Sequence, residues 1–263
     1  MPTTTPFRVA AALLLAAALQ TATADERFFT YSYEPKVLPQ GAIELEQWAT
    51  LRNGKEHVYA RWDVRTEFEI GLTDRLTTAL YMNWKNEWGF KNATTLAENK
   101  AAFTGWSSEW KYKLTDPTAD SIGVLLYGEV GVDRHEWELE GKLVLGKNFG
   151  NVVTALNAIV ELEGETEAEL EEGEPESKME LEWVLENTAG IAYRLNSFAL
   201  GLEGRTHTEI VEGETEHTAF FLGPVINVRS ERWWATLTVL YQLTDILDEH
   251  ERTETRLILG IHL

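Results

Sequence analysis

Hydrophobic and polar residues alternate with period two through most of the chain after about residue 41. In the segment 57–72, HVYARWDVRTEFEIGL, the odd positions carry His, Tyr, Arg, Asp, Glu and Gly, and the even positions carry mainly large apolar residues. A β-strand sorts residues in this way because successive side chains point to opposite faces, whereas helical spacing does not. The pattern therefore predicts strands along nearly the whole chain.

The alternation predicts twelve strands, most of them longer than the ~5–6 residues usual in soluble proteins and long enough for the ~9–11 residues of a tilted bilayer-crossing strand. They are expected near 42–52, 57–72, 76–88, 101–114, 121–133, 136–147, 151–164, 178–194, 197–210, 216–228, 232–243 and 254–263. The predicted fold class is all-β, a transmembrane antiparallel up-and-down β-barrel. An even strand count brings both termini to one end, and the short connections at 73–75, 147–151, 195–196 and 229–231 fall at that end, as in outer-membrane barrels.

The first residues predict export. Residues 1–24 hold one positive charge, an apolar run and Ala22-Thr23-Ala24, which is typical of a secretory signal peptide and its cleavage site. Residues 25–40 then form an N-terminal segment in the periplasm or tucked into the barrel mouth, and residues 41–263 form the barrel. No apolar run after residue 24 is long enough for a spanning helix, so a membrane-embedded chain must be a closed barrel.

Composition narrows the function further. The chain has 263 residues and a formal net charge of −20, which argues against nucleic acid as a partner because phosphates require a basic face. Cys is absent, which excludes disulfides, thiolate metal sites and a cysteine nucleophile. No nucleotide-binding loop or HExxH motif is present, and we expect no cofactor, no metal and no enzyme activity.

The segments VRTEFEIGLTDRLTTALYMNW and TRLILGIHL, with the export signal, resemble bacterial outer-membrane β-barrel proteins of uncharacterised porin-like families. The resemblance covers about 41–263 and implies the outer membrane of a Gram-negative bacterium. The partners it implies are outer-membrane lipid, lipopolysaccharide and the barrel-assembly machinery. Two features depart from the class: the chain ends in Leu263 rather than an aromatic residue, and Pro224 falls inside a predicted strand, where we expect a bulge or a strand end.

In such a barrel the apolar face meets lipid and the charged face lines the lumen. The principal lumen-lining candidates are Arg61, Asp63, Arg65, Glu67, Glu69, Glu109, Lys111, Glu140, Lys142, Glu182, Glu203 and Arg205. The same parity adds Glu44, Glu46, Lys113, Glu129, Glu138, Glu161, Glu180, Glu186 and Arg256. This mainly acidic lining suits a narrow, porin-like channel for small solutes or ions. The alternative is a salt-bridge network that plugs a structural or adhesive surface barrel.

Three further features bear on these alternatives. Trp84, Trp88, Trp137, Trp183, Trp233 and Trp234 lie near strand ends and predict girdles at the membrane interfaces. The run 161–176, with nine Glu in sixteen residues, predicts a solvated outer loop over 165–177. His207 and His217 flank one outer loop, which leaves an outer-membrane hydrolase as a third hypothesis, although no His has a Ser two residues away on its strand face.

Overall fold

The computed structural model describes residues 26–90, 95–96, 101–133, 135–171 and 174–263. The predicted signal peptide, residues 1–24, lies outside the described residues. No helix in the described part of the chain is long and apolar enough to cross a membrane.

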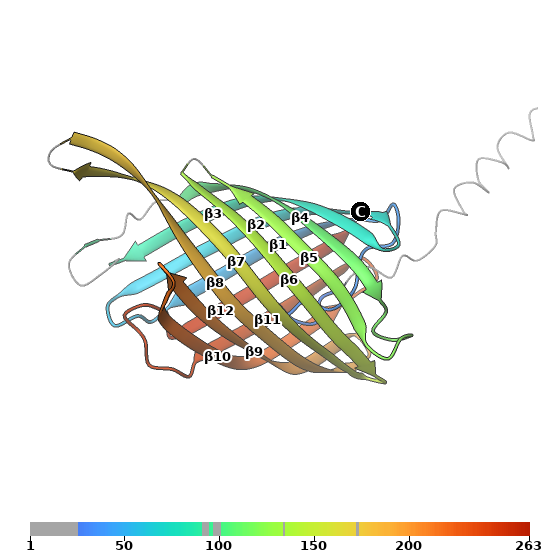
Figure 1. Ribbon diagram of the computed structural model, residues 1–263. Helices are drawn as coiled ribbons and strands as arrows, with labels where there is room; N and C mark the ends of the chain where they lie inside the picture. Colours follow the sequence, from blue (N-terminus) through green and yellow to red (C-terminus); the bar gives the residue numbers. More distant parts are fainter. Residues whose placement is uncertain (1–25, 91–94, 97–100, 134, 172–173) are drawn as a thin grey trace, which may run out of the picture.

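Twelve strands close into a single antiparallel barrel in which each strand pairs with its sequence neighbours and β1 pairs with β12 (Figure 1). The predicted fold class and strand count are confirmed. The strands are β1 (Ile43–Asn53), β2 (Tyr59–Thr73), β3 (Leu76–Gly89), β4 (Ala101–Thr115), β5 (Gly123–Val132), β6 (Glu136–Phe149), β7 (Val152–Glu171), β8 (Glu174–Leu195), β9 (Phe198–Val211), β10 (Glu214–Arg229), β11 (Trp233–Gln242) and β12 (Thr253–His262).

The barrel has an apolar outside and a polar inside. Exposed large hydrophobic residues occupy the outward positions of the strands, as with Trp62, Leu126 and Leu237, whereas Glu44, Glu109 and other inward charges are buried. A soluble protein could not leave so much apolar surface in water, and a closed barrel satisfies its backbone hydrogen bonds without an edge. The barrel therefore spans a membrane, and its fold is that of the bacterial outer membrane.

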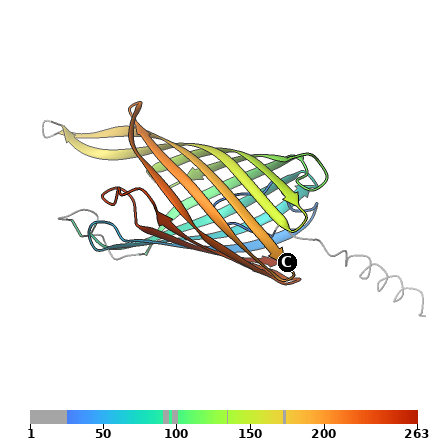
Figure 2. The same ribbon diagram turned by 90° about the horizontal axis from the view of Figure 1, so that it is seen from below.

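The two ends of the barrel differ. The turns 74–75, 116–122, 150–151, 196–197 and 230–232 lie at the end that also holds the C-terminus, which we call the turn end. The opposite, loop end holds the segments 54–58, 212–213 and 243–252 and a protruding hairpin (Figure 2). In outer-membrane barrels short turns face the periplasm and longer loops face outward, so the loop end is extracellular.

The protruding hairpin corrects the prediction of an acidic loop over 165–177. β7 continues to Glu171 and β8 begins at Glu174, and the two strands stay paired in register to Glu171↔Glu174 (Figure 1). The physical reason is visible in the sequence, because Glu occupies every odd position from 161 to 171. This alternation continues the period of the strand, so the pairing extends beyond the barrel rim.

Two local predictions are also wrong. β10 runs straight through Pro224, which pairs with Leu202 of β9 without a bulge, and only the ladder to β11 lacks pairs at Gly223 and Pro224. The missing N–H of proline removes one ladder bond without shifting the register of the pairing with β9. Trp234 belongs to no girdle, because it is fully buried and its Nε1 donates to Glu44 Oε1 at 2.7 Å. Adjacent strand residues face opposite sides, so only Trp233 can point outward.

Residues 26–38 of the N-terminal segment extend into the barrel interior rather than ending at its mouth. Arg27 to Pro35, together with Val37 and Leu38, is buried. Three buried apolar clusters join it to the wall. Phe28 and Phe29 cluster with residues of β7 to β10, and Tyr31 clusters with residues of β10 and β11. Tyr33 and Val37 share the third cluster with residues of β1, β5, β6, β11 and β12. We call residues 26–38 the plug.

Candidate functional site

A cavity of about 810 Å³ occupies the loop half of the barrel interior. Tyr31 and Tyr33 of the plug line it together with Trp48 and Arg256, and Lys55, Glu249 and His250 line it at the loop end. The cavity is therefore a vestibule that opens toward the loop end and has the plug as its floor. Part of the predicted lumen residues line its walls: Arg61, Asp63, Arg65, Glu140, Lys142, Glu182 and Arg205.

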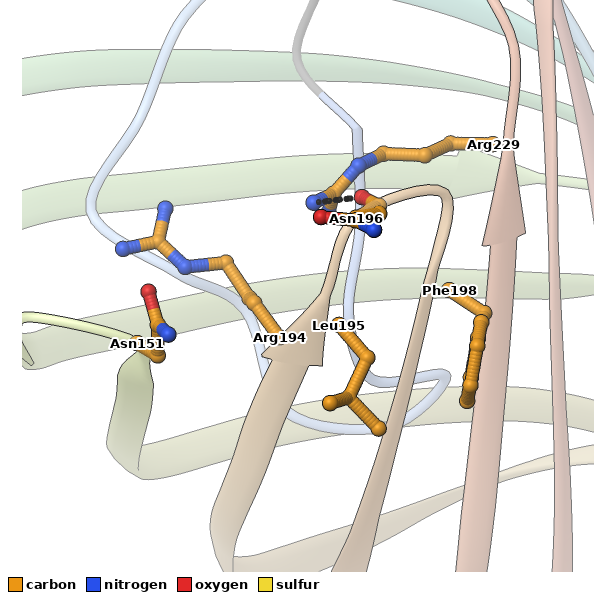
Figure 3. Close-up of a pocket in the computed structure, with 6 residues that line it drawn as sticks. All are labelled: Asn151, Arg194, Leu195, Asn196, Phe198 and Arg229. Atoms are coloured by element: carbon orange, nitrogen blue, oxygen red, sulfur yellow. Dashed lines mark hydrogen bonds between the residues drawn. The ribbon is translucent and has the colours of Figure 1, made fainter.

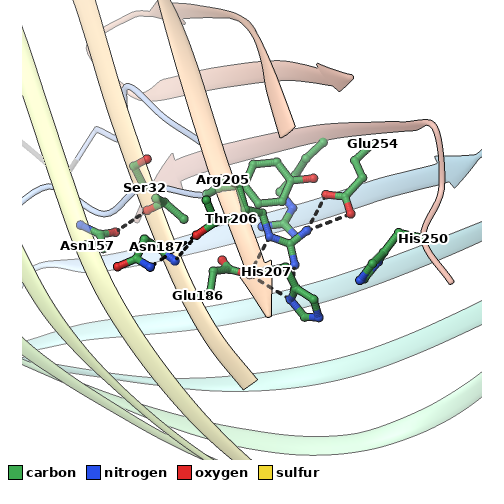
Figure 4. A network of polar contacts seen from close by, with 12 residues as sticks. Ser32, Asn157, Glu186, Asn187, Arg205, Thr206, His207, His250 and Glu254 are labelled. Carbon is green, nitrogen blue, oxygen red and sulfur yellow. Dashed lines mark hydrogen bonds and ion pairs between the residues drawn. The ribbon is translucent and has the colours of Figure 1, made fainter. Parts of the chain in front are cut away.

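A continuous chain of ion pairs crosses the vestibule. Arg61 pairs with Asp63 at 2.7 Å, Asp63 with Arg52 at 3.1 Å, and Arg52 with Glu254 at 2.9 Å. Arg205 then contacts Glu254 at 2.8 Å and Glu186 at 2.6 Å (Figure 4). The Arg205–Glu254 contact joins β9 to β12, so the chain ties opposite parts of the wall together. Arg52 and Glu254 are absent from the candidate residues of the sequence, although they follow the same alternation.

The other candidate residues fall into local pairs on the wall. Arg65 pairs with Glu129, and Lys142 pairs with Glu140 at 2.8 Å. Lys111 lies 2.7 Å from Glu69 and 3.1 Å from Glu109. Glu67 is buried beside them.

The plug is held mainly by the Glu203 carboxylate at the centre of β9. The backbone N–H groups of Thr30, Tyr31 and Ser32 donate to Glu203 at 3.1, 2.9 and 2.6 Å. A carboxylate that accepts several backbone N–H groups forms a strong anchor because these hydrogen bonds are charge-assisted. The Thr238 hydroxyl donates to the same carboxylate at 2.7 Å.

Further contacts fix the plug on both sides of this anchor. Asn157 accepts the backbone N–H of Tyr33 at 2.6 Å and donates to its carbonyl at 2.9 Å. Asn227 donates to the carbonyl of Arg27 at 3.0 Å. Phe29 fits against Gly190, where a Cβ atom would lie 2.6 Å from its ring. The plug therefore sits in a wall shaped for it.

At the turn end a second cavity, of about 590 Å³, lies between the β8–β9 turn and its neighbours (Figure 3). Arg194 and Arg229 line it, and Arg229 donates to the carbonyl of Asn196 at 2.7 Å. Arg229 also pairs with Glu26 at 3.5 Å, which places the start of the plug at this end. The plug thus enters from the turn end.

Carboxylates form two rows on neighbouring strands at the loop half of the barrel. Glu138, Glu163 and Glu182 lie directly opposite one another across β6, β7 and β8, and they line the vestibule. Glu136, Glu165 and Glu180 form the next row toward the loop end of the barrel. Like charges at directly opposed strand positions repel, so these acidic rows favour cations close to the wall.

Three histidines and a glutamate meet at the vestibule rim. His207 and Glu209 are inward residues of β9, His217 is on β10, and His250 comes from the loop 243–252. One ligand atom from each lies within 4.8 Å of the others. Burial lowers the pKa of His250 to about 2, with the nearby His207, Arg205 and His217 acting in the same direction, so its imidazole is neutral at neutral pH.

Sequence reasoning found His207 and His217 but missed the other two members. A β-bulge between Thr215 and His217 shifts the register by one residue, which sets His217 directly opposite Glu209. The sequence does carry one signal, since His207 and Glu209 are two residues apart and share a strand face.

Comparison with known proteins gives a family and a fold. The model of a family described as "Family of unknown function (DUF6662)" matches residues 21–263. No curated protein matches the sequence.

Solved structures of outer-membrane porins and channels share the architecture. The NanC porin is 10% identical with a TM-score of 0.54, covering 83% of this chain and 100% of its own. The KdgM porin in complex with disordered oligogalacturonate is 9% identical with a TM-score of 0.53, covering 83% and 98%. The COG4313 outer membrane channel from Pseudomonas putida F1 is 10% identical with a TM-score of 0.54, covering 89% and 100%. At these identities the likeness shows the fold alone.

Proposed function

We propose that this chain, which belongs to the DUF6662 family of unknown function, is a narrow, gated outer-membrane channel that passes small cations and performs no chemical step. The observation that carries the proposal is the vestibule of about 810 Å³, which opens at the loop end and stops at a separate segment of chain, the plug. A barrel closed only by its own wall side chains would have no part that can leave. Here the obstruction is a non-strand segment attached at one end of the barrel.

The charge of the vestibule favours cations. The acidic rows face a cavity with low-dielectric walls, where the field of fixed charges is focused. The arginines and lysines of the same cavity are largely paired with carboxylates, as in the chain from Arg61 to Glu186. Net negative charge therefore remains on the β6–β8 side. Rings of Asp and Glu have this role in cation-selective channels.

A structural surface barrel is the second candidate. The ion-pair chain and the anchored plug both stiffen the interior, as such a barrel would require. The two candidates differ in one respect: a channel conducts when the plug leaves, and a structural barrel does not.

Neutralising the inner acidic row tests the selectivity. The triple variant Glu138→Gln, Glu163→Gln, Glu182→Gln is expected to lose cation preference because it removes three directly opposed charges from the vestibule wall. The measurement is the reversal potential across a KCl gradient in planar bilayers. It is expected to move from the cation side toward zero.

The matched control is Glu231→Gln, which removes one carboxylate from the exposed turn between β10 and β11, outside both acidic rows. This variant should keep the reversal potential of the unmodified protein. An anion-selective unmodified protein, or a triple variant with unchanged selectivity, would contradict the acidic rows as the selectivity element.

A further inference from the structure

The four residues that meet at the vestibule rim, which we call the rim cluster, are His207, Glu209, His217 and His250. The close contacts of His217 in this cluster cannot all be hydrogen bonds at the same time. His217 Nε2 lies 2.8 Å from His250 Nε2 and 3.2 Å from Glu209 Oε2. If His217 donates its Nε2 proton to His250 Nε2 or to Glu209 Oε2, no proton of His217 is left for the second of these atoms. If His250 donates to His217 instead, the lone pairs of His217 and Glu209 face each other. Several lone pairs thus converge on one point, which is the arrangement of ligands around a cation.

We propose that His207, Glu209, His217 and His250 bind one divalent transition-metal ion of the zinc class. The observed separations of 2.8 and 3.2 Å approach the ~3.3 Å edge of a tetrahedron with metal–ligand bonds of ~2.0–2.1 Å. A small movement of the side chains suffices to admit the ion. Four protein ligands complete a tetrahedral site.

The donor set selects the kind of ion. Three imidazoles and one carboxylate suit Zn²⁺, Ni²⁺ or Cu²⁺, whereas Ca²⁺ and Mg²⁺ require mainly oxygen ligands. The acidic cluster formed by Glu138, Glu140 and Glu161 has only oxygen donors and differs from the rim cluster in this respect.

The surroundings support the ligand geometry. His207 Nδ1 lies 3.5 Å from Glu186 Oε2 and 3.0 Å from the Arg205 guanidinium (Figure 4). Nε2 is the ligand nitrogen in the tautomer that carries its proton on Nδ1 and donates it to Glu186, which requires Arg205 to direct its N–H groups to the carboxylates of Glu186 and Glu254 instead. A carboxylate behind a metal-bound imidazole fixes the orientation of the ring. The side chains of His207 and His217 are only 16% and 9% exposed, so the site is partly shielded from water.

The site has a consequence for the vestibule. Three ligands come from the ends of β9 and β10, and His250 comes from the loop 243–252. A bound ion therefore ties this loop to the barrel wall at the vestibule rim. The inference goes beyond the proposed channel and does not depend on conduction.

The test is Zn²⁺ binding to the folded, untagged mature chain in detergent micelles, stripped of metal with EDTA and followed by competition with a chromophoric chelator. One tight site per chain is expected. His250→Ala and His217→Ala are expected to weaken that site by more than about 100-fold, since loss of even an outer partner of a ligand costs about 10–100-fold. His135→Ala removes an exposed histidine of the β5–β6 loop and should bind like the unmodified protein.

Co²⁺ gives a second readout that does not depend on affinity. The unmodified chain should show the intense visible absorption of four-coordinate Co²⁺, and His250→Ala should lose it. Because His250 lies in a loop outside the strands, this variant leaves the barrel pairing intact, which heat-dependent gel mobility verifies. The site is refuted if the unmodified chain binds Zn²⁺ no more tightly than His250→Ala. A Co²⁺ spectrum like that of the aqueous ion, or an equal loss in His135→Ala, refutes it as well.

Discussion

Replacing Arg205 with alanine is expected to lower the free energy of unfolding by about 3–5 kcal/mol, the cost of breaking a buried ion pair from one side. Arg205 is 6% exposed and Glu254 is fully buried. The substitution leaves Glu254 with Arg52 and leaves Glu186 beside His207, so a fully buried carboxylate and a partly buried one lose their shared counterion. Urea unfolding in lipid vesicles, followed by tryptophan fluorescence, measures the change.

Two comparisons separate the buried charge from a general effect of substitution. Lys178→Ala breaks an exposed pair with Glu180 and should change stability by less than ~1 kcal/mol. Arg205→Met combined with Glu186→Gln and Glu254→Gln should lose less stability than Arg205→Ala, because no carboxylate is left unpaired by the change. Equal losses in Arg205→Ala and Lys178→Ala would show that the ion-pair chain does not hold the barrel together.

Replacing Glu203 with alanine is expected to release the plug and increase the conductance. The variant leaves the N–H groups of Thr30, Tyr31 and Ser32 buried without their acceptor, at a cost of about 1–3 kcal/mol for each. A total above about 3 kcal/mol raises the ratio of open to closed molecules by more than about 100-fold. Single-channel recording in planar bilayers measures the open fraction.

The control for this variant is Glu214→Ala, which removes an exposed carboxylate at the start of β10. Its open fraction should equal that of the unmodified protein. A folded Glu203→Ala protein with an unchanged open fraction would show that Glu203 is not what keeps the plug in place.

The sequence predicted the barrel because one physical rule repeats in every strand. Because lipid surrounds the barrel and its interior is polar, apolar and polar residues must alternate along each strand. The polarity of residues such as Trp62 and Asp63 therefore indicates which face of the barrel each one occupies. The same rule, applied to the odd-numbered glutamates from 161 to 171, would also have predicted the extended hairpin. High acidity is compatible with a strand as long as the alternation of polar and apolar positions is intact.

The plug and the rim cluster could not be predicted in this way. Residues 26–38 have no periodicity, and their partners, such as Asn157 and Glu203, are more than 120 residues away along the chain. The position of His217 depends on a bulge, and that of His250 on the path of the loop 243–252. Side-chain alternation records which face a residue occupies, but it does not record which distant residue it meets there.

The most direct test of the account is the single-channel conductance of the mature chain with and without residues 26–36. Because these residues fill the barrel between its walls and form the floor of the vestibule, the intact chain should be closed most of the time. The shortened chain, with β1 and its partners unchanged, should be persistently open and cation-selective. The same low conductance for both proteins would contradict the plug as the gate and the barrel as a channel.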